Sequence, residues 1–285
     1  MRGKTVVITG ANSGIGYATA ESLAVDGAEV VLLCRNAAKA QAAMDRIRSR
    51  APSAQLHFHP LDLASFASVR AAAESVLEAH PRIDVLVNNA GLYMPRRALT
   101  EDGLETTVQV NHFAPFLLTS LLADRIRASA PARIVNVSSA AHRSGTVDLD
   151  DLQSERRYRG LEAYGVSKTM NILHVRSLAR RLDPGAVTAN ALHPGVVASN
   201  FGQASVAFRV MFFVLRPILK SSRQGAATTL HLVRSPEGGQ KTGRYFADAK
   251  EARPLAQARD DALAEQVWEK SERLTGAPPW PLPEA

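Results

Sequence analysis

Short runs of apolar and β-branched residues alternate with longer helix-like segments along this chain. The apolar runs predict strands at Thr5–Thr9, Glu29–Leu33, Gln55–Phe58, Val85–Val87, Ile134–Ser138, Val187–Leu192 and, more weakly, Arg244–Phe246. Periodicity and length predict helices at Gly14–Asp26, Ala37–Arg50, Ser65–His80, Asp102–Arg127 and Ala163–Arg181. Such alternation predicts an α/β fold, in which a doubly wound parallel sheet carries helices on both faces.

The length and the cysteine content limit the organisation of the chain. Its 285 residues are enough for one large domain with a buried core, and no linker divides them. We therefore expect a single domain over residues 1–275, followed by a Pro-rich tail, 276–285, that is extended or disordered. The single cysteine, Cys34, excludes an intramolecular disulfide, which favours a reducing, cytoplasmic setting.

The charge pattern argues against a nucleic-acid partner, and the length of the apolar runs argues against a membrane span. The formal net charge is +7, but Lys and Arg are spread over helix-like segments and interleaved with acidic residues, as on solvated helix faces. We expect no nucleic-acid partner. No signal peptide is recognisable, and no run reaches the roughly 18 apolar residues that a membrane span needs, so no transmembrane segment is expected.

The first predicted strand leads into a glycine-rich turn, Thr9-Gly10-Ala11-Asn12-Ser13-Gly14-Ile15-Gly16. Gly10 allows a sharp turn, Gly14 lets a pyrophosphate approach the backbone, and Gly16 lets the next helix pack closely on the strand. Free N–H groups at the helix start favour an anion. An ordinary turn is the alternative, but its position after the first strand favours a dinucleotide site that includes Asn12, Ser13 and Ile15.

The end of the second predicted strand bears on the choice of cofactor. An acidic residue there would hydrogen-bond the adenosine ribose of NAD, whereas an arginine accommodates a 2′-phosphate. This chain has Cys34-Arg35-Asn36, with Lys39 in the next turn. Arg35 can pair with a phosphate through two hydrogen bonds, although a merely solvated arginine is the alternative. The sequence therefore favours NADP(H) over NAD.

One tyrosine is placed for proton transfer. Of the five tyrosines, only Tyr164 has a lysine four residues later, Lys168. On a helix this spacing puts both side chains on one face. An isolated tyrosine has a pKa of about 10, and a nearby positive charge lowers it. Alone the motif is weak, because a surface Tyr–Lys pair has the same spacing.

Polar residues follow two further predicted strands. Ser138 and Ser139 end the run from Ile134, at the carboxyl end of a parallel strand, where ligands bind in doubly wound sheets. A hydroxyl there could hold a carbonyl oxygen. Asn88 and Asn89 follow the strand that begins at Val85, and they either line a cofactor site or fasten neighbouring strands.

Together these residues resemble the short-chain dehydrogenase/reductase family, whose members have a single Rossmann-type domain. The matching pieces, in the family's order, are Thr9–Gly16, Asp62-Leu63, Asn88–Gly91, Asn111, Ser139, Tyr164 with Lys168, and Pro194-Gly195. Further pieces resemble its retinol-dehydrogenase branch, to which WW-domain oxidoreductase and protochlorophyllide reductase are related. They are Cys34–Asn36, Val110–Phe113, Arg133–Ser139 followed by His142, His193–Val197, Gly243–Phe246 and the helix around Glu265–Leu274.

The resemblance implies a catalytic tetrad. Tyr164 would be the acid and base, Lys168 would lower its pKa and bind the nicotinamide ribose, and Ser139 would orient the substrate oxygen. Ser138 is the neighbouring candidate for the serine role. Asn111 would hold a water that links Lys168 to solvent. Ala114-Pro115 follows Asn111 closely and removes a backbone donor from the predicted helix.

The resemblance also implies cofactor contacts beyond the glycine-rich turn. Asp62 would touch the adenine, Asn89 the adenosine ribose region, and Val197 the nicotinamide carboxamide. No metal ion is expected. The complete set implied is Arg35, Asn36, Asp62, Leu63, Asn89, Ala90, Gly91, Tyr164, Lys168, Pro194, Gly195 and Val197.

An apolar segment, 205–215, falls where the family places its variable substrate lid, here about 195–222. We expect it to cover a bulky hydrophobic substrate. Packing in the core or in a dimer interface is one alternative, and contact with a membrane surface through Arg209, Arg216 and Lys220 is another. The resemblance also suggests a homo-oligomer.

These observations predict an NADP(H)-dependent carbonyl reductase or alcohol dehydrogenase that acts on a ketone or aldehyde. Reduction of a carbon–carbon double bond on the same scaffold is an alternative. A cofactor-binding regulator without turnover is a second one, against which the complete tetrad argues.

Overall fold

The computed structural model describes residues 1–183, 185–197 and 220–280. Its strands are β1 (Thr5–Thr9), β2 (Glu29–Cys34), β3 (Leu56–Pro60), β4 (Val85–Asn88), β5 (Ala132–Val137), β6 (Val187–His193), β7 (Tyr245–Ala247) and β8 (Lys250–Glu251). Its helices are α1 (Gly14–Val25), α2 (Ala37–Arg48), α3 (Phe66–Ala79), α4 (Thr106–Val108), α5 (Ala114–Ala128), α6 (Gly160–Arg181), α8 (Ser222–Arg234), α9 (Pro236–Gln240) and α10 (Asp261–Thr275). None of these helices is both long and apolar enough to span a membrane.

The strands form one sheet in the order β3-β2-β1-β4-β5-β6-β7-β8. All neighbouring pairs are parallel except the last, β7 with β8. The strand order reverses between β1 and β4, and doubly wound sheets bind their ligands at such a switch point, beyond the carboxyl ends of the strands. The predicted fold class is confirmed.

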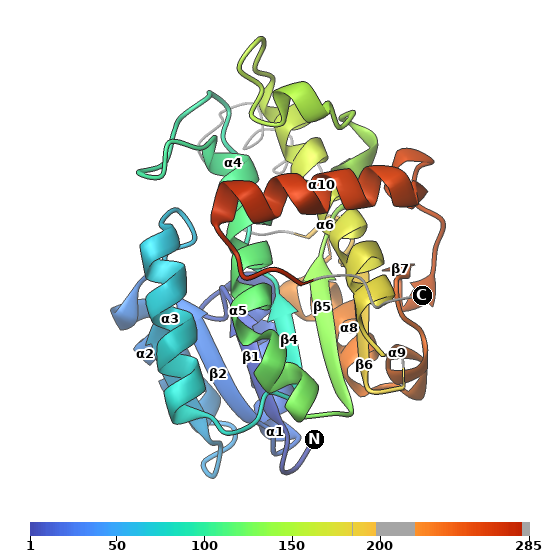
Figure 1. The fold of residues 1–285 in the computed structure, drawn as a ribbon. Helices are drawn as coiled ribbons and strands as arrows, with labels where there is room; N and C mark the ends of the chain where they lie inside the picture. Colours follow the sequence, from blue (N-terminus) through green and yellow to red (C-terminus); the bar gives the residue numbers. More distant parts are fainter. Residues whose placement is uncertain (184, 198–219, 281–285) are drawn as a thin grey trace.

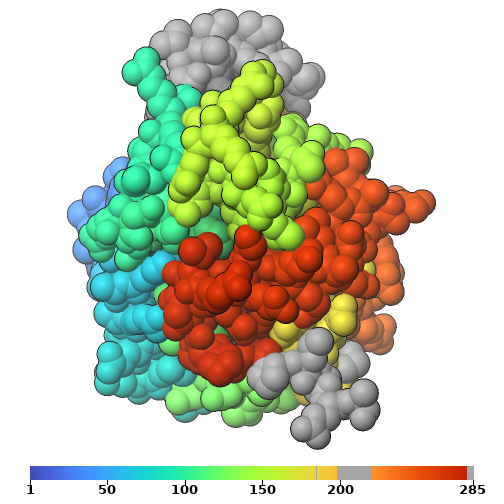
Figure 2. Space-filling model, turned by 45° about the horizontal axis from the view of Figure 1, so that its top comes forward, coloured from blue at the N-terminus to red at the C-terminus, as the bar shows by residue number. Residues whose placement is uncertain are grey.

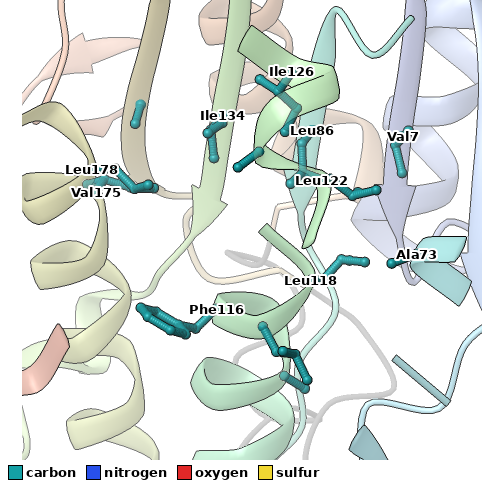
Figure 3. Packing of buried hydrophobic residues seen from close by; sticks show 14 of the residues in the cluster. Val7, Ala73, Leu86, Phe116, Leu118, Leu122, Ile126, Ile134, Val175 and Leu178 are labelled. Atoms are coloured by element: carbon teal, nitrogen blue, oxygen red, sulfur yellow. The ribbon is translucent and has the colours of Figure 1, made fainter. Parts of the chain in front are cut away.

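Helices cover both faces of the sheet (Figure 1). Residues of α3, α5 and α6 share one buried apolar cluster, whereas residues of α1, α2 and α8 share another. Figure 3 shows the first cluster, in which Leu118, Leu122 and Ile126 of α5 pack near Leu86 of β4 and Ile134 of β5. Because both faces are buried, the central strands are largely apolar, as their sequences indicated, and buried polar residues such as Asn88 and Asn136 are hydrogen-bonded to each other.

One predicted helix is wrong at its start. The sequence predicts a helix throughout Asp102–Arg127, but the helix begins only at Thr106. Glu105 ends the preceding turn, and its carboxylate accepts hydrogen bonds from the N–H groups of Thr107 and Val108, which caps the helix. Residues Gln109–Phe113 then form a wider, π-helical turn before α5. Hydrophobic periodicity does not reveal such a cap or such a turn.

The C-terminal part of the chain packs on the helical layer that contains α5 and α6. α10 lies across these helices (Figure 1), and Figure 2 shows it, with the residues after it, as one broad surface. The helix ends at Gly276, which has a positive φ of 58°. The sequence predicts an extended or disordered tail here. Residues 277–280 have no regular secondary structure, Trp280 is buried against Trp268, and its carbonyl accepts a hydrogen bond from Arg181. The tail up to Trp280 is therefore packed on the domain.

Candidate active site

The candidate residues gather at the carboxyl ends of the central strands. The glycine-rich turn follows β1, Asn89 to Gly91 follow β4, Ser139 follows β5, and Pro194 follows β6. Tyr164 and Lys168 reach the same edge from α6. The parallel register brings residues far apart in sequence to one place, which lies at the switch point of the sheet.

The glycine-rich turn has the geometry of a phosphate-binding loop. Gly10 and Gly14 have φ values of 67° and 56°. A Cβ on Gly16 would lie 2.4 Å from the carbonyl oxygen of Gly10, so only glycine fits. Beside Gly14 the space is open, because a Cβ there would meet no atom within 4 Å. Ser13 precedes α1 but makes no side-chain capping hydrogen bond, so the loop fits a bound pyrophosphate.

The residues after β4 fasten it to β1. The N–H groups of Asn89 and Ala90 each donate to the hydroxyl of Thr9 at 3.0 Å, and the Asn89 amide donates to the Thr9 carbonyl at 2.8 Å. Asn88 binds the side chains of Thr119 and Asn136. The structure thus shows that these amides fasten strands, and the cofactor contact of Asn89 remains a prediction.

The end of β2 carries an exposed cation and no acidic residue. The Arg35 side chain is 77% exposed, and its guanidinium lies 3.7 Å from the carboxylate of Asp62. Such a loose surface pair contributes little to stability, so Arg35 can turn to another anion. The Asn36 side chain instead caps α2 through the N–H of Lys39, and Leu63 is buried.

Tyr164 and Ser139 form the centre of the candidate site. Burial raises the pKa of Tyr164, and the hydrogen-bonding contact of its hydroxyl with the Ser139 side chain partly opposes the increase. The Lys168 ammonium lies 5.5 Å from the centre of the Tyr164 ring and donates to the carbonyl of Val137 at 3.0 Å. Burial lowers the pKa of Lys168 to about 8.

The two serines after β5 have different surroundings. The Ser138 hydroxyl is buried and donates to the carbonyl of Lys168 at 2.7 Å. Ser139 faces Tyr164 and also accepts a hydrogen bond from the N–H of Ala141 at 3.1 Å. The structure therefore brings Ser139, rather than Ser138, to the tyrosine.

Asn111 lies in the π-helical turn and holds the loop that follows β4. Its amide nitrogen donates to the carbonyl of Leu92 at 2.9 Å and to the hydroxyl of Ser167 at 3.0 Å, while its oxygen accepts from the N–H of Leu92 at 2.8 Å. A Cβ on Gly91 would lie 3.1 Å from the Asn111 oxygen and 3.2 Å from the Lys168 nitrogen. Asn111 therefore lies close to Lys168 on the same side of Gly91, and its water-holding role remains a prediction.

Two histidines hold the turn at Ser139 and Ala140 in place. The sequence motifs assigned no role to either of them. The Nδ1 atom of His142 lies 2.7 Å from the carbonyl of Ser139, and the Nδ1 atom of His193 accepts from the N–H of Ala140 at 3.1 Å. Burial lowers the pKa of His193 to about 4, so this ring is neutral and can accept. The sequence signal for these roles was position, since His142 lies close after Ser139 and His193 directly precedes Pro194.

The residues on either side of 198–219 meet beside α1. Val197 pairs with Lys220 as an isolated bridge, and the N–H of Lys220 donates to the Val196 carbonyl at 2.8 Å. Gly225 lies between Val197 and Ile15, since a Cβ on Gly225 would lie 2.6 Å from the Val197 side chain and 3.1 Å from that of Ile15. Pro194 is buried and Gly195 has a φ of 89°. Of the predicted lid, about 195–222, residues 198–219 lie outside the described part of the chain, and these include the apolar segment 205–215.

The comparison with protein families agrees with this geometry. The family model described as short chain dehydrogenase matches residues 4–209, which contain every residue of the predicted tetrad and cofactor site. The chain belongs to the short-chain dehydrogenase family. It is therefore an oxidoreductase with a Rossmann-type fold that binds a nicotinamide cofactor and a small-molecule substrate.

Relatives place the chain near one branch of the family, as its motifs indicated. It is 43% identical to retinol dehydrogenase 12 of Mus musculus, over 96% of this chain and 87% of that protein. It is 42% identical to the WW domain-containing oxidoreductase of Gallus gallus, over 96% of this chain and 68% of that protein.

Solved structures of similar fold include a bacterial member with cofactor. An uncharacterised protein from Mycobacterium paratuberculosis has 32% sequence identity and a TM-score of 0.78, covering 99% of this chain and 96% of that one. A short chain dehydrogenase from Burkholderia cenocepacia J2315, solved in complex with NADP, has 29% identity and a TM-score of 0.69, covering 86% and 96% of the two chains.

Proposed function

We propose that this short-chain dehydrogenase is an NADP(H)-dependent carbonyl reductase or alcohol dehydrogenase acting on a bulky, hydrophobic ketone, aldehyde or alcohol. The observation that carries the proposal is the contact between Tyr164 and Ser139, with the Lys168 ammonium beside the tyrosine ring. Two hydroxyls at one point can bind a single carbonyl oxygen from two sides, which is the arrangement that protonation of that oxygen requires.

In this mechanism the chain's own residues position the substrate and move its proton. The Ser139 hydroxyl donates to the substrate oxygen and orients it. Tyr164 gives its proton to that oxygen in reduction and takes it back in alcohol oxidation. The charge on Lys168 stabilises the tyrosinate that remains. When bound, the nicotinamide cofactor supplies the hydride or accepts it.

The preference for NADP(H) rests on Arg35. It follows β2, no acidic residue stands beside it at the strand end, and its only ion pair among the described residues is the loose one with Asp62. A guanidinium binds a phosphate through two parallel hydrogen bonds. The complex of the Burkholderia cenocepacia relative with NADP supports the same choice.

A large apolar substrate is suggested by the sequence of the predicted lid and by the relatives. The segment 205–215 contains Phe208, Phe212 and Phe213 and a single charged residue, Arg209. Several relatives are named for retinol, a large apolar alcohol. We do not single out retinol, because the proposal concerns the substrate class.

The test measures NADPH oxidation against a panel of hydrophobic ketones and aldehydes. We expect turnover by the wild type and a loss of about 10²–10⁴-fold in Tyr164→Phe, with NADPH binding retained. Tyr17→Phe, which removes only the hydroxyl that contacts Glu21 on α1, serves as the matched control and should keep its rate. Equal rates in wild type and Tyr164→Phe would remove Tyr164 from the mechanism. Tight NADPH binding without turnover on any substrate would instead favour a non-catalytic role.

A further inference from the structure

Glu29, His57 and His80 gather toward the end of the sheet that lies opposite the active site, and His59 lies next to them. Glu29 is the first residue of β2, His57 and His59 lie on β3, and His80 follows the end of α3. His57 and His59 are two residues apart on a strand, so both side chains point to the same face of the sheet. The glycine-rich turn and Arg35 follow the carboxyl ends of β1 and β2, away from this cluster.

The side chains approach one another closely. One Glu29 oxygen, Oε1, lies 2.8 Å from the Nδ1 atom of His80 and 3.3 Å from the Nε2 atom of His57. The other oxygen, Oε2, accepts a hydrogen bond from the Thr5 hydroxyl at 3.0 Å, which fixes the carboxylate. One ligand-type atom from each of Glu29, His57 and His80 lies within 4.8 Å of the other two.

We propose that Glu29, His57 and His80 form a binding site for a divalent transition-metal ion of the zinc type. Two imidazole nitrogens and one carboxylate oxygen are ligands that Zn²⁺ commonly takes in proteins. Two atoms bound tetrahedrally to zinc at about 2.0–2.1 Å stand roughly 3.3 Å apart. The separations of 2.8 Å and 3.3 Å from Glu29 are close to that value, and the two histidine nitrogens, within 4.8 Å of each other, would move to it on binding.

The groups around His80 match what a metal-binding histidine needs. A ligating histidine usually donates its second ring N–H to a partner, which fixes its tautomer and orientation. The Nε2 atom of His80 lies 3.1 Å from the Nε2 atom of His59, and the Nδ1 atom of His59 lies 2.6 Å from the hydroxyl of Ser75. With a metal on Nδ1, His80 can donate through Nε2 to His59, and His59 can donate in turn to Ser75.

The same atoms also form a plain hydrogen-bonded chain when the protons run in the opposite direction. Ser75 then donates to His59, His59 donates to His80, and His80 donates to Glu29. This hydrogen-bonded chain leaves the half-exposed His57 ring with its contacts to Glu29 and to the edge of the His80 ring, whereas the metal site gives it a ligand's place.

The position of the site indicates a structural role. A metal bound there would join the start of β2, the start of β3 and the end of α3, and would hold the outer strands of the sheet to that helix. Since the active-site residues lie beyond the opposite ends of the strands, the ion would stabilise the fold and take no part in hydride transfer.

The experiment titrates Zn²⁺ into the full chain, freed of metal with a chelator and carrying no histidine tag, by calorimetry. We expect one ion per chain with a micromolar or lower Kd, and about 100-fold weaker binding in His57→Ala, since a ligand counts for at least as much as the 10–100-fold typical of outer-shell partners. His231→Ala is the matched control. His231 also pairs with a glutamate, Glu237, at 2.9 Å, but no third ligand-type residue in the described part of the chain joins that pair.

A second measurement does not depend on any variant. Co²⁺ bound in place of Zn²⁺ at a tetrahedral site of nitrogen and oxygen ligands gives intense visible absorption, and one equivalent should produce it in the wild type. The proposal is overturned if the wild type binds no stoichiometric Zn²⁺, or if His57→Ala binds as tightly as the wild type. Loss of binding in His231→Ala alone would overturn it too, by placing the ion elsewhere.

Discussion

The buried charged residues at the two ends of the sheet differ in whether they have a partner of opposite charge. At the amino ends of the strands, Asp84 is only 1% exposed, yet Lys4 and Arg82 donate to its carboxylate at 2.8 Å and the N–H of Thr5 donates at 2.9 Å. At the carboxyl ends, Lys168 is 3% exposed, and no ion pair among the described residues includes it.

The difference is visible in the pKa values. Burial raises the pKa of Asp84, but hydrogen bonds from Arg82, Lys4 and Thr5 outweigh it and leave the pKa below its usual value. Burial acts on Lys168 unopposed and lowers its pKa to about 8. Breaking a buried charge pair destabilises the fold, whereas a buried charge left without a counter-ion costs stability and is available for chemistry. The comparison predicts that mutations at the two ends separate stability from activity.

The largest expected effect is that of Lys168→Met, which removes the unpaired charge and keeps most of the side chain's volume. We expect kcat to fall by about 10²–10⁴-fold, the range typical of lost proton-transfer assistance. Stability to urea should stay equal or rise, because an unpaired buried charge is gone. Steady-state kinetics and urea unfolding measure the two quantities. A variant of reduced stability but full activity would reverse the comparison.

The pH dependence of the wild type sharpens this assignment. Because the pKa of Lys168 is lowered to about 8, the lysine is charged below that pH and loses its charge above it. Without the charge Tyr164 is a weaker acid, so kcat/KM for carbonyl reduction should fall as the pH rises through about 8. Lys168→Met should keep a low rate without this step. A wild-type profile that is flat across roughly one pH unit on either side of this pKa would contradict the role given to Lys168.

Asp84→Asn tests the opposite end of the sheet. Loss of the charge leaves Lys4 and Arg82 without their partner, and hydrogen bonds to a charged group contribute about 1.5–3 kcal/mol, so we expect a loss of about 2–3 kcal/mol in the free energy of unfolding. Because the folded pKa is depressed, this contribution is present above the unfolded value of about 3.9 and is lost as the pH falls through the folded pKa. Urea unfolding at neutral pH and at a pH below the unfolded value measures it. The kcat should not change, and a large drop in kcat would show that the two ends are coupled.

Arg35→Ala removes an exposed charge at the carboxyl edge that contributes little to the fold. We expect the Kd for NADPH to rise by roughly 10–100-fold, as expected for the loss of a charge-assisted hydrogen bond pair, while the Kd for NADH stays the same. Fluorescence titration with both cofactors measures the change. An equal loss for the two cofactors would mean that Arg35 does not bind the 2′-phosphate, and the preference for NADP(H) would lose its support.

The smallest expected effect distinguishes two adjacent serines. Ser138→Ala removes a buried hydrogen bond to the carbonyl of Lys168 and should cost about 1 kcal/mol of stability with little loss of kcat. Ser139→Ala should leave stability nearly unchanged and lower kcat by at least about tenfold, because it removes a hydroxyl at the substrate oxygen. Thermal unfolding and kinetics on the pair measure both. The reverse pattern would exchange the roles of the two residues.

Much of the fold and the candidate site could be predicted from local features. Strand runs, the glycine-rich turn after β1 and the spacing of Tyr164 and Lys168 depend on neighbours in the sequence, and so does the strand end that carries Arg35. Other features depend on distant partners. The start of the helix at Thr106 depends on capping by Glu105, and the burial of Trp280 depends on a surface formed by α5, α6 and α10.

The sequence by itself determined the fold class, the position of the glycine-rich turn and the residue types available at the strand ends, because each follows from periodicity, glycine's backbone freedom or a fixed helical spacing. Only the tertiary structure decided which serine faces Tyr164, that Asn89 fastens β4 to β1, and that Glu29, His57 and His80 meet. The physical reason is that these contacts join segments far apart in the chain, and their geometry is set by strand register and helix packing.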